Sequence, residues 1–224
     1  MTRVASVHSY FFDRRESLKT IPKLLPDGSK LVWLKQVHSA HVLEVKNAVS
    51  FGHSEADAMV TLLPNVALVI HTADCIPLLS FEDEVIGACH GGWRGISKGI
   101  ISNWVHKMVS LGAHKERLKV LIGPAIGPCH FEVGFEVAEE LCKIDGKKLN
   151  GNQLQKIVHP HGDVNKKYID LPALAVEHLL LNGILANNID VSKSCTYCAP
   201  EKYFSYRRNK TEMGRLEAVI LRSK

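Results

Sequence analysis

Residues 69–95 read VIHTADCIPLLSFEDEVIGACHGGWRG and contain two apolar runs, each leading to a side chain that can bind a metal. The first run passes through His71 to Cys75, and the second ends at His90. Apolar runs of this length bounded by turn residues predict buried strands. The acidic residues 82–84 between them indicate the exposed tip of a hairpin-like connection. If the strands are neighbours, Cys75 and His90 face one small volume.

A thiol and an imidazole held together have more than one use. They form part of a zinc site, or a nucleophile pair in which His90 activates Cys75. In a purely structural interpretation Cys75 is an inert buried thiol and His90 a core histidine, because free cysteine is among the most buried residue types. The pair alone does not decide between these interpretations.

Composition limits the class of protein. The chain has 224 residues, 46% of them hydrophobic, which is enough for a real core, and we expect a single domain over residues 1–224. No run is long and apolar enough to span a bilayer, and the first residues lack the apolar segment of a signal peptide. We therefore expect a cytoplasmic protein whose six cysteines are reduced. The net charge of +5 is scattered along the chain, which favours an anionic small ligand over nucleic acid or a membrane.

A third candidate metal ligand, His38, ends a strand-like run over residues 30–38. With Cys75 and His90 it would give three protein ligands and an open fourth position, which is the arrangement of a catalytic zinc site. Asp57 precedes an apolar run. It is either a turn residue or a carboxylate that orients a metal-bound histidine.

The rest of the chain predicts an alternation of helices and strands. Helical spacing covers residues 96–111, 136–143 and 171–181, and strands are expected at 6–12, 42–46, 118–122 and 216–221. Residues 145–167 are polar and are expected to be rich in loops. Cys195 and Cys198 have the spacing of half a zinc knuckle. We assign them no role, because the sequence shows no matching second half.

Several segments share their residues and their order with one known family. They are 35–38 (KQVH), 56–61 (ADAMVT), 72–77 (TADCIP), 90–95 (HGGWRG), 122–129 (IGPAIGPC), 131–134 (FEVG), 204–208 (FSYRR) and 214–215 (GR). On these segments the chain resembles the YfiH family, also named the multicopper polyphenol oxidase or laccase-domain family. Together the segments are highly specific, and they extend over nearly everything after residue 30.

The resemblance implies an α+β fold in which two packed mixed β-sheets are flanked by helices, in the layer order α/β/β/α. It implies that His38, Cys75 and His90 bind zinc, with copper less expected. As our own hypothesis of the mechanism, Asp57 moves a proton beside Cys75 and His90. The resemblance also implies phosphorolysis of purine nucleosides (adenosine, inosine, guanosine, methylthioadenosine) and deamination of adenosine. Planar guanidinium groups suit phosphate. The candidate phosphate ligands are Lys35, Arg94, Arg207 and Arg208. We expect the protein to be a monomer or weak homodimer.

Other functions stay open on the sequence. A cysteine or zinc hydrolase acting on amide bonds, as in the editing of cell-wall precursors, would use the same centre. A polyphenol oxidase needs copper and a dense set of His-x-His ligands, and only residues 159–161 have that spacing. A non-enzymatic zinc module would require a closed site that recruits Cys89 or Cys129.

Overall fold

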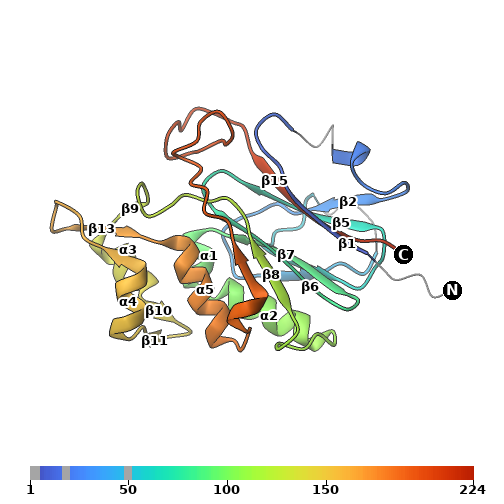
Figure 1. The fold of residues 1–224 in the computed structure, drawn as a ribbon, viewed down its shortest axis with the longest axis horizontal. Coiled ribbons are helices and arrows are strands. Elements are labelled where there is room, and N and C mark those ends of the chain that lie inside the picture. The colour runs from blue at the N-terminus through green and yellow to red at the C-terminus, as the bar shows by residue number, and fades with distance from the viewer. Residues whose placement is uncertain (1–5, 17–20, 48–51) are drawn as a thin grey trace.

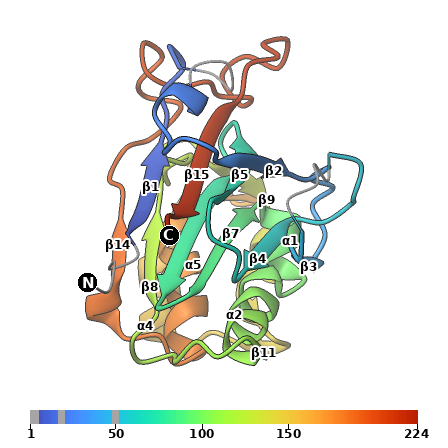
Figure 2. The same ribbon diagram turned by 90° about the vertical axis from the view of Figure 1, so that its right-hand side faces the viewer.

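Two β-sheets form the frame of the molecule (Figures 1 and 2). The computed structural model describes residues 6–16, 21–47 and 52–224. The smaller sheet has the strand order β1 (Val7–Phe11), β15 (Leu216–Arg222), β5 (Val66–Thr72) and β2 (Lys30–Trp33). The larger sheet has the order β14 (Ile189–Val191), β8 (Lys119–Ile122), β6 (Ile76–Glu82), β7 (Val85–Gly91), β4 (Ala58–Thr61) and β3 (Val42–Glu44).

The predicted hairpin tip is confirmed, because β6 and β7 form an antiparallel pair with Asp83 between them in the left-handed region (φ 48°). The apolar run that leads to Cys75 is a different strand, β5, which lies in the smaller sheet and is not the hairpin partner of β7. Leu79, Ile86 and Ala88 point into the core between the two sheets. Leu78 belongs to the core on the opposite face. Because both faces are covered, these strands read as continuous apolar runs, and each fully buried aliphatic side chain contributes about 1.5–3 kcal/mol.

Strand β5 is buried in the same two-sided way. Leu68 and Ile70 join the core between the sheets, whereas Ala67 and Val69 face the other side. There they pack with the short 3-10 helix η1 (Ile21–Lys23), whose Ile21 is fully buried. The two sheets are therefore packed together with helices outside them, which confirms the predicted α+β architecture.

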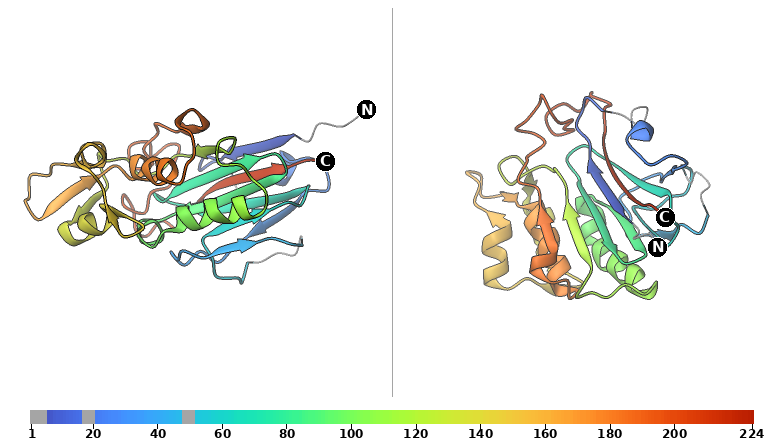
Figure 3. Two further views of the ribbon diagram at one scale, coloured as in Figure 1. Left: turned by 90° about the horizontal axis from the view of Figure 1, so that it is seen from below. Right: turned by 45° about the vertical axis from the view of Figure 1, so that its right-hand side comes forward.

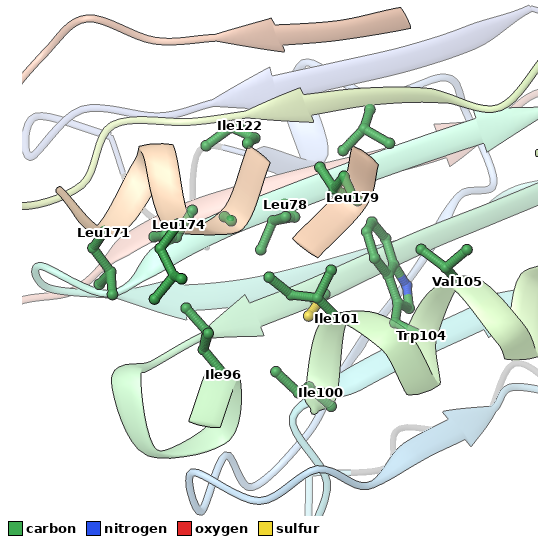
Figure 4. Close-up of a cluster of buried hydrophobic side chains, with 14 of the residues drawn as sticks. Leu78, Ile96, Ile100, Ile101, Trp104, Val105, Ile122, Leu171, Leu174 and Leu179 are labelled. Carbon is green, nitrogen blue, oxygen red and sulfur yellow. The ribbon is translucent and has the colours of Figure 1, made fainter. Parts of the chain in front are cut away.

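Helices α2 (Ile100–Ser110) and α5 (Leu171–Leu181) cover the outer face of the larger sheet (Figure 4). Trp104 of α2 lies directly over Gly87 of β7. A Cβ atom at Gly87 would come within 2.6 Å of Trp104 Nε1, so only glycine allows this close packing. The indole N–H donates a hydrogen bond to the Met59 carbonyl at 3.3 Å.

The helix predicted over residues 96–111 is in fact two helices. Helix α1 (Trp93–Ser97) ends before α2 begins, and Gly99 between them has φ 85°. Glycine adopts this left-handed backbone at little cost. The apolar spacing continues across the break, so periodicity alone could not reveal it.

A part of the molecule beside the sheets, yellow to orange in Figure 3, is more ordered than predicted. Residues 145–167, expected to be loop-rich, contain helix α4 (Gly151–Ile157), which begins with a capping box formed by Asn150 and Gln153. The other elements here are α3 (Phe135–Leu141), the hairpin β10 (Lys143–Ile144) and β11 (Lys147–Lys148), and the sheet β12 (Val158–His159), β13 (Lys166–Ile169) and β9 (Glu132–Gly134). Short polar elements of this kind carry little hydrophobic periodicity.

The remaining predictions differ in accuracy. The helix at 171–181 coincides with α5, and the expected strands at 118–122 and 216–221 correspond to β8 and β15. The strand predicted over residues 30–38 is too long, because β2 ends at Trp33. The 3-10 helix η2 (Ala186–Asn188) leads into β14. Among the described residues, no helix is long and apolar enough to cross a membrane.

Candidate metal centre

Three candidate ligands meet at one end of the sheets. His90 lies near the end of β7, Cys75 lies in the turn between β5 and β6, and His38 lies in the loop after β2. One donor atom from each residue lies within 4.8 Å of the other two. His38 Nε2 is 3.8 Å from Cys75 Sγ, and the rings of His38 and His90 meet edge to face with centroids 4.8 Å apart. The structure thus brings together residues that are up to 52 positions apart in the sequence.

The backbone around the cluster is shaped to allow this approach. His38 has φ 58°, an unusual conformation for a residue with a side chain. Gly92, just after β7, has no side chain in the way: a Cβ there would lie 2.5 Å from His38 Cδ2 and 3.4 Å from Cys75 Sγ. Gly92 therefore gives the cluster its space.

Asp57 is fully buried beneath the cluster. Its Oδ1 lies 2.8 Å from His90 Nδ1, and its two oxygens also accept hydrogen bonds from the backbone N–H groups of His38 (2.9 Å) and Ser39 (2.6 Å) and from the Ser39 hydroxyl (2.7 Å). One carboxylate thus fixes both the imidazole of His90 and the strained loop at His38. With Nδ1 donating to Asp57, Nε2 of His90 is the ring atom left for a metal.

The electrostatics of the cluster favour a thiolate. Burial alone raises the pKa of the Cys75 thiol, but the positive charge of His90 and hydrogen bonds from His38 and His90 bring it down to about 6. Burial alone lowers the pKa of His90, but the Cys75 charge and the hydrogen bond to Asp57 raise it to about 9. Burial opposes ionisation of Asp57 too, yet the hydrogen bonds from His90 and Ser39 hold its pKa well below the usual range. A metal bound here would displace the proton on His90.

The donor set fits a tetrahedral metal ion. With metal–sulfur and metal–nitrogen bonds of about 2.3 and about 2.1 Å, a tetrahedral ion separates sulfur from nitrogen by about 3.6 Å. The distance from Cys75 Sγ to His38 Nε2 is 3.8 Å. The closed site that a non-enzymatic zinc module would require does not form here, because Cys89 points into the helix-covered core and Cys129 belongs to another cluster. This centre therefore has three donors and one open side.

The open side faces a cavity of about 880 Å³, within the usual size range for small-molecule sites. His38, Cys75 and His90 all line it. Its basic lining residues are Arg94, Arg207, Lys210 and Arg215, and its larger apolar or aromatic ones are Leu34, Trp93, Ile126, Phe131 and Tyr206. A cavity with these walls can bind a ligand that carries both an anionic group and a flat ring.

Only two of the four predicted phosphate ligands line the cavity. They are Arg94, whose guanidinium lies 4.4 Å above the Trp93 ring, and Arg207. Lys35 is exposed and pairs with Glu55 at 2.8 Å, outside the cavity. Arg208 donates hydrogen bonds to the carbonyls of Thr196, Tyr197 and Tyr203, so its charge holds loop backbone instead.

Sequence reasoning missed several residues of the cavity wall. Arg215 stood in a family segment, but nothing near it suggested a binding role. Asp74 has φ 88° and accepts hydrogen bonds from the Thr196 hydroxyl (2.6 Å) and the Arg207 backbone N–H (2.7 Å), so it ties the C-terminal loop to the turn that carries Cys75. These contacts span more than 120 residues, and no local pattern signals them.

Fold and site together define an α+β protein with an open Cys/His donor set at its strand ends. A model of the family described as multi-copper polyphenol oxidoreductase laccase matches residues 13–223, and the chain belongs to this family. It is 37% identical over 196 residues to a Shigella flexneri protein named purine nucleoside phosphorylase YfiH, covering 86% of this chain and 74% of that protein. The predicted resemblance to the YfiH family is confirmed.

Other relatives extend the comparison. Adenosine deaminase RL5, from an unknown prokaryotic organism, is 33% identical over 206 residues, covering 88% of this chain and 76% of that protein. The crystal structure of the Bacillus licheniformis hypothetical protein YfiH has the same fold, with a TM-score of 0.86 at 22% identity over 97% of this chain and 93% of that one. The crystal structure of YlmD from Geobacillus stearothermophilus has a TM-score of 0.77 at 27% identity, covering 88% of this chain and 74% of that one. The relatives named purine nucleoside phosphorylase and adenosine deaminase support the prediction that this chain is an enzyme.

Proposed function

We propose that this protein is a zinc-dependent purine nucleoside phosphorylase that also deaminates adenosine. The observation that carries the proposal is the Cys75, His38 and His90 cluster opening into a basic, ring-sized cavity. Relatives of this chain named purine nucleoside phosphorylase and adenosine deaminase support the choice of reactions. The substrates we propose are adenosine, inosine, guanosine and methylthioadenosine with phosphate.

Zinc would be held by His38 Nε2, Cys75 Sγ and His90 Nε2, where it would supply Lewis-acid polarisation of a substrate or water oxygen. The thiolate and two imidazoles are donors that suit zinc. Asp57 is buried, and His90 and Ser39 already occupy its oxygens. We therefore give Asp57 the task of orienting His90, in place of the proton-shuttle role predicted from the sequence.

The basic residues of the cavity would hold phosphate. Arg94, Arg207 and Arg215 line the cavity with planar donor groups, and Lys210 adds a fourth positive charge. In phosphorolysis a phosphate oxygen bonds to C1′ of the ribose while the bond from C1′ to the purine breaks. These cations would offset the negative charge of the attacking phosphate and fix its position.

The cavity also offers flat surfaces for a purine. Phe131 and Tyr206 line the cavity together with Ile126. Aromatic faces bind flat rings by offset stacking and edge contacts. In deamination, water replaces the amino group at C6 of the adenine ring and ammonia leaves, so the ring must present that edge to the cluster.

A thiol nucleophile is the second candidate, because Cys75 and His90 form a thiolate–imidazolium pair in the absence of metal. That pair would serve an amide hydrolase. A copper-dependent phenol oxidase is less supported, because a multicopper oxidase needs a dense set of His-x-His ligands and only residues 159–161 have that spacing. We further propose that residues 1–224 act as one domain in the cytoplasm.

The test combines metal analysis with a base-release assay on inosine and adenosine, with and without phosphate. We expect phosphate-dependent release of free purine, and its loss in Cys75→Ala together with the zinc of this centre. Cys142→Ala is the matched control, since Cys142 lies outside both Cys/His clusters. Phosphate-independent cleavage of amides, with Cys75 readily alkylated, would instead establish the hydrolase.

A further inference from the structure

A second group of side chains that can bind a metal ion lies in two loops outside the first centre, which is formed by His38, Cys75 and His90. Cys129 and His130 form part of the turn after β8, and Cys195 and Cys198 lie in the loop that follows β14. The interpretation of Cys195 and Cys198 as an unmatched half-site was wrong. Its second half is Cys129 with His130, more than 60 residues earlier in the chain.

The four donor atoms form a compact set, all within 4.8 Å of one another. Cys129 Sγ lies 3.7 Å from Cys195 Sγ and 3.6 Å from Cys198 Sγ, and Cys198 Sγ lies 3.4 Å from His130 Nδ1. A tetrahedral zinc ion sets its sulfur ligands about 3.8 Å apart and places sulfur about 3.6 Å from nitrogen. The observed distances match the edges of that tetrahedron. They are far longer than a disulfide bond of about 2.05 Å.

Surrounding contacts hold the donors in place. The Gly127 N–H donates a hydrogen bond to Cys195 Sγ at 3.2 Å. The His130 ring stacks on Tyr197, with centroids 3.8 Å apart and planes inclined by 16°. A hydrogen bond from the Thr196 N–H to the Ala125 carbonyl (3.0 Å) joins the two loops directly. Supporting contacts of this kind orient metal ligands and tune their affinity.

We propose that Cys129, His130, Cys195 and Cys198 bind a second metal ion, zinc, in a closed structural site. Three thiolates and one imidazole complete a tetrahedron with no open position, which is the arrangement of structural rather than catalytic zinc. Cys129 and Cys198 are exposed, so an ion can enter from solvent. The site differs in this respect from the first centre, which opens into the cavity.

The second site braces the wall of the cavity. Ile126 and Phe131, on either side of the turn with Cys129, both line the cavity. Thr196, between the other two cysteines, donates its hydroxyl hydrogen bond to Asp74, the neighbour of Cys75. Metal binding at such a site contributes folding free energy to the segments that it joins. Loss of the ion therefore loosens the wall that would bind substrate.

The Cys75→Ala variant separates the two sites, because it removes a donor from the first centre only. Elemental analysis of this variant, purified without added metal, should find about one zinc per chain. The double variant Cys195→Ser with Cys198→Ser should hold one zinc fewer than Cys142→Ser. It should also melt at a lower temperature. A double variant with the metal content of Cys142→Ser, or a folded Cys75→Ala protein without metal, would overturn the proposal.

A second measurement does not depend on the double variant folding. Cobalt(II), which also accepts thiolate and imidazole ligands, is added to metal-free Cys75→Ala protein. Strong near-ultraviolet absorption from thiolate-to-cobalt charge transfer is expected. Absence of that absorption would contradict the site, and so would an intact mass showing a disulfide among these cysteines under reducing conditions. If wild-type and Cys75→Ala proteins each hold one zinc, the second site stands and the zinc of the proposed function fails.

Discussion

Gly92→Ala is the substitution whose effect the structure defines most closely. Gly92 has φ −73° and ψ 147°, a backbone that alanine adopts without strain, so the effect is steric alone. The added Cβ would lie 2.5 Å from His38 Cδ2. Carbon atoms in contact normally lie about 3.5–4.0 Å apart. The His38 ring must therefore move by about 1 Å, whereas metal sites tolerate displacements of about 0.2 Å.

We expect Gly92→Ala to bind zinc at the first centre at least ten- to a hundredfold more weakly, the loss typical when an orienting partner is removed. That range corresponds to about 1.4–2.8 kcal/mol. The assay is competition with a zinc chelator, with thermal unfolding measured alongside. Gly151→Ala is the matched control, because a Cβ at Gly151 meets nothing within 4 Å. Zinc affinity in Gly92→Ala equal to that of the control would refute the proposed position of His38.

Three further predictions follow from particular contacts. Asp57→Asn should weaken zinc binding about ten- to a hundredfold and abolish base release, because the amide cannot replace the carboxylate that fixes His90; chelator competition measures this. Arg94→Ala should raise the KM for phosphate about tenfold or more, whereas Lys35→Ala, outside the cavity, should leave it unchanged in the same assay. Burial lowers the pKa of His178 to about 4, so below about pH 6.5 the unfolded chain binds a proton there that the folded protein does not. The free energy of unfolding is therefore unaffected by this group above pH 6.5 and decreases as pH falls towards 4. In denaturant titrations, stability should fall less from pH 7 to 4 in His178→Leu than in the wild type, by up to about 3 kcal/mol.

The central hairpin and the first centre could be predicted because their signals are local. Apolar runs buried on both faces produce the continuous patterns of β5 and β7, and these two runs lead to Cys75 and His90. The structure places His38 beside Cys75 and His90, as predicted, although the strand before it ends earlier and its own backbone is left-handed. Its role as a metal ligand stays a prediction. Loop conformation depends here on Asp57, a partner 19 residues away.

The predictions that were wrong or missing concern residues whose positions depend on long-range packing. Arg208 and Arg207 are neighbours in one segment, yet the first holds loop carbonyls and only the second lines the cavity. Cys129 and Cys195 meet only because β14 pairs with β8 in parallel and brings the loops after both strands together. A search for short-range ligand spacing could not find a site built from two such loops.

The proposed function is tested most directly by assaying one preparation of wild-type protein beside Cys75→Ala and Cys142→Ala. Zinc per chain and purine release from inosine, with and without phosphate, are measured on each sample. The wild type and Cys142→Ala should release purine only with phosphate, and Cys75→Ala should contain one zinc fewer and release none. Undiminished phosphate-dependent release by Cys75→Ala would contradict the assignment of this centre.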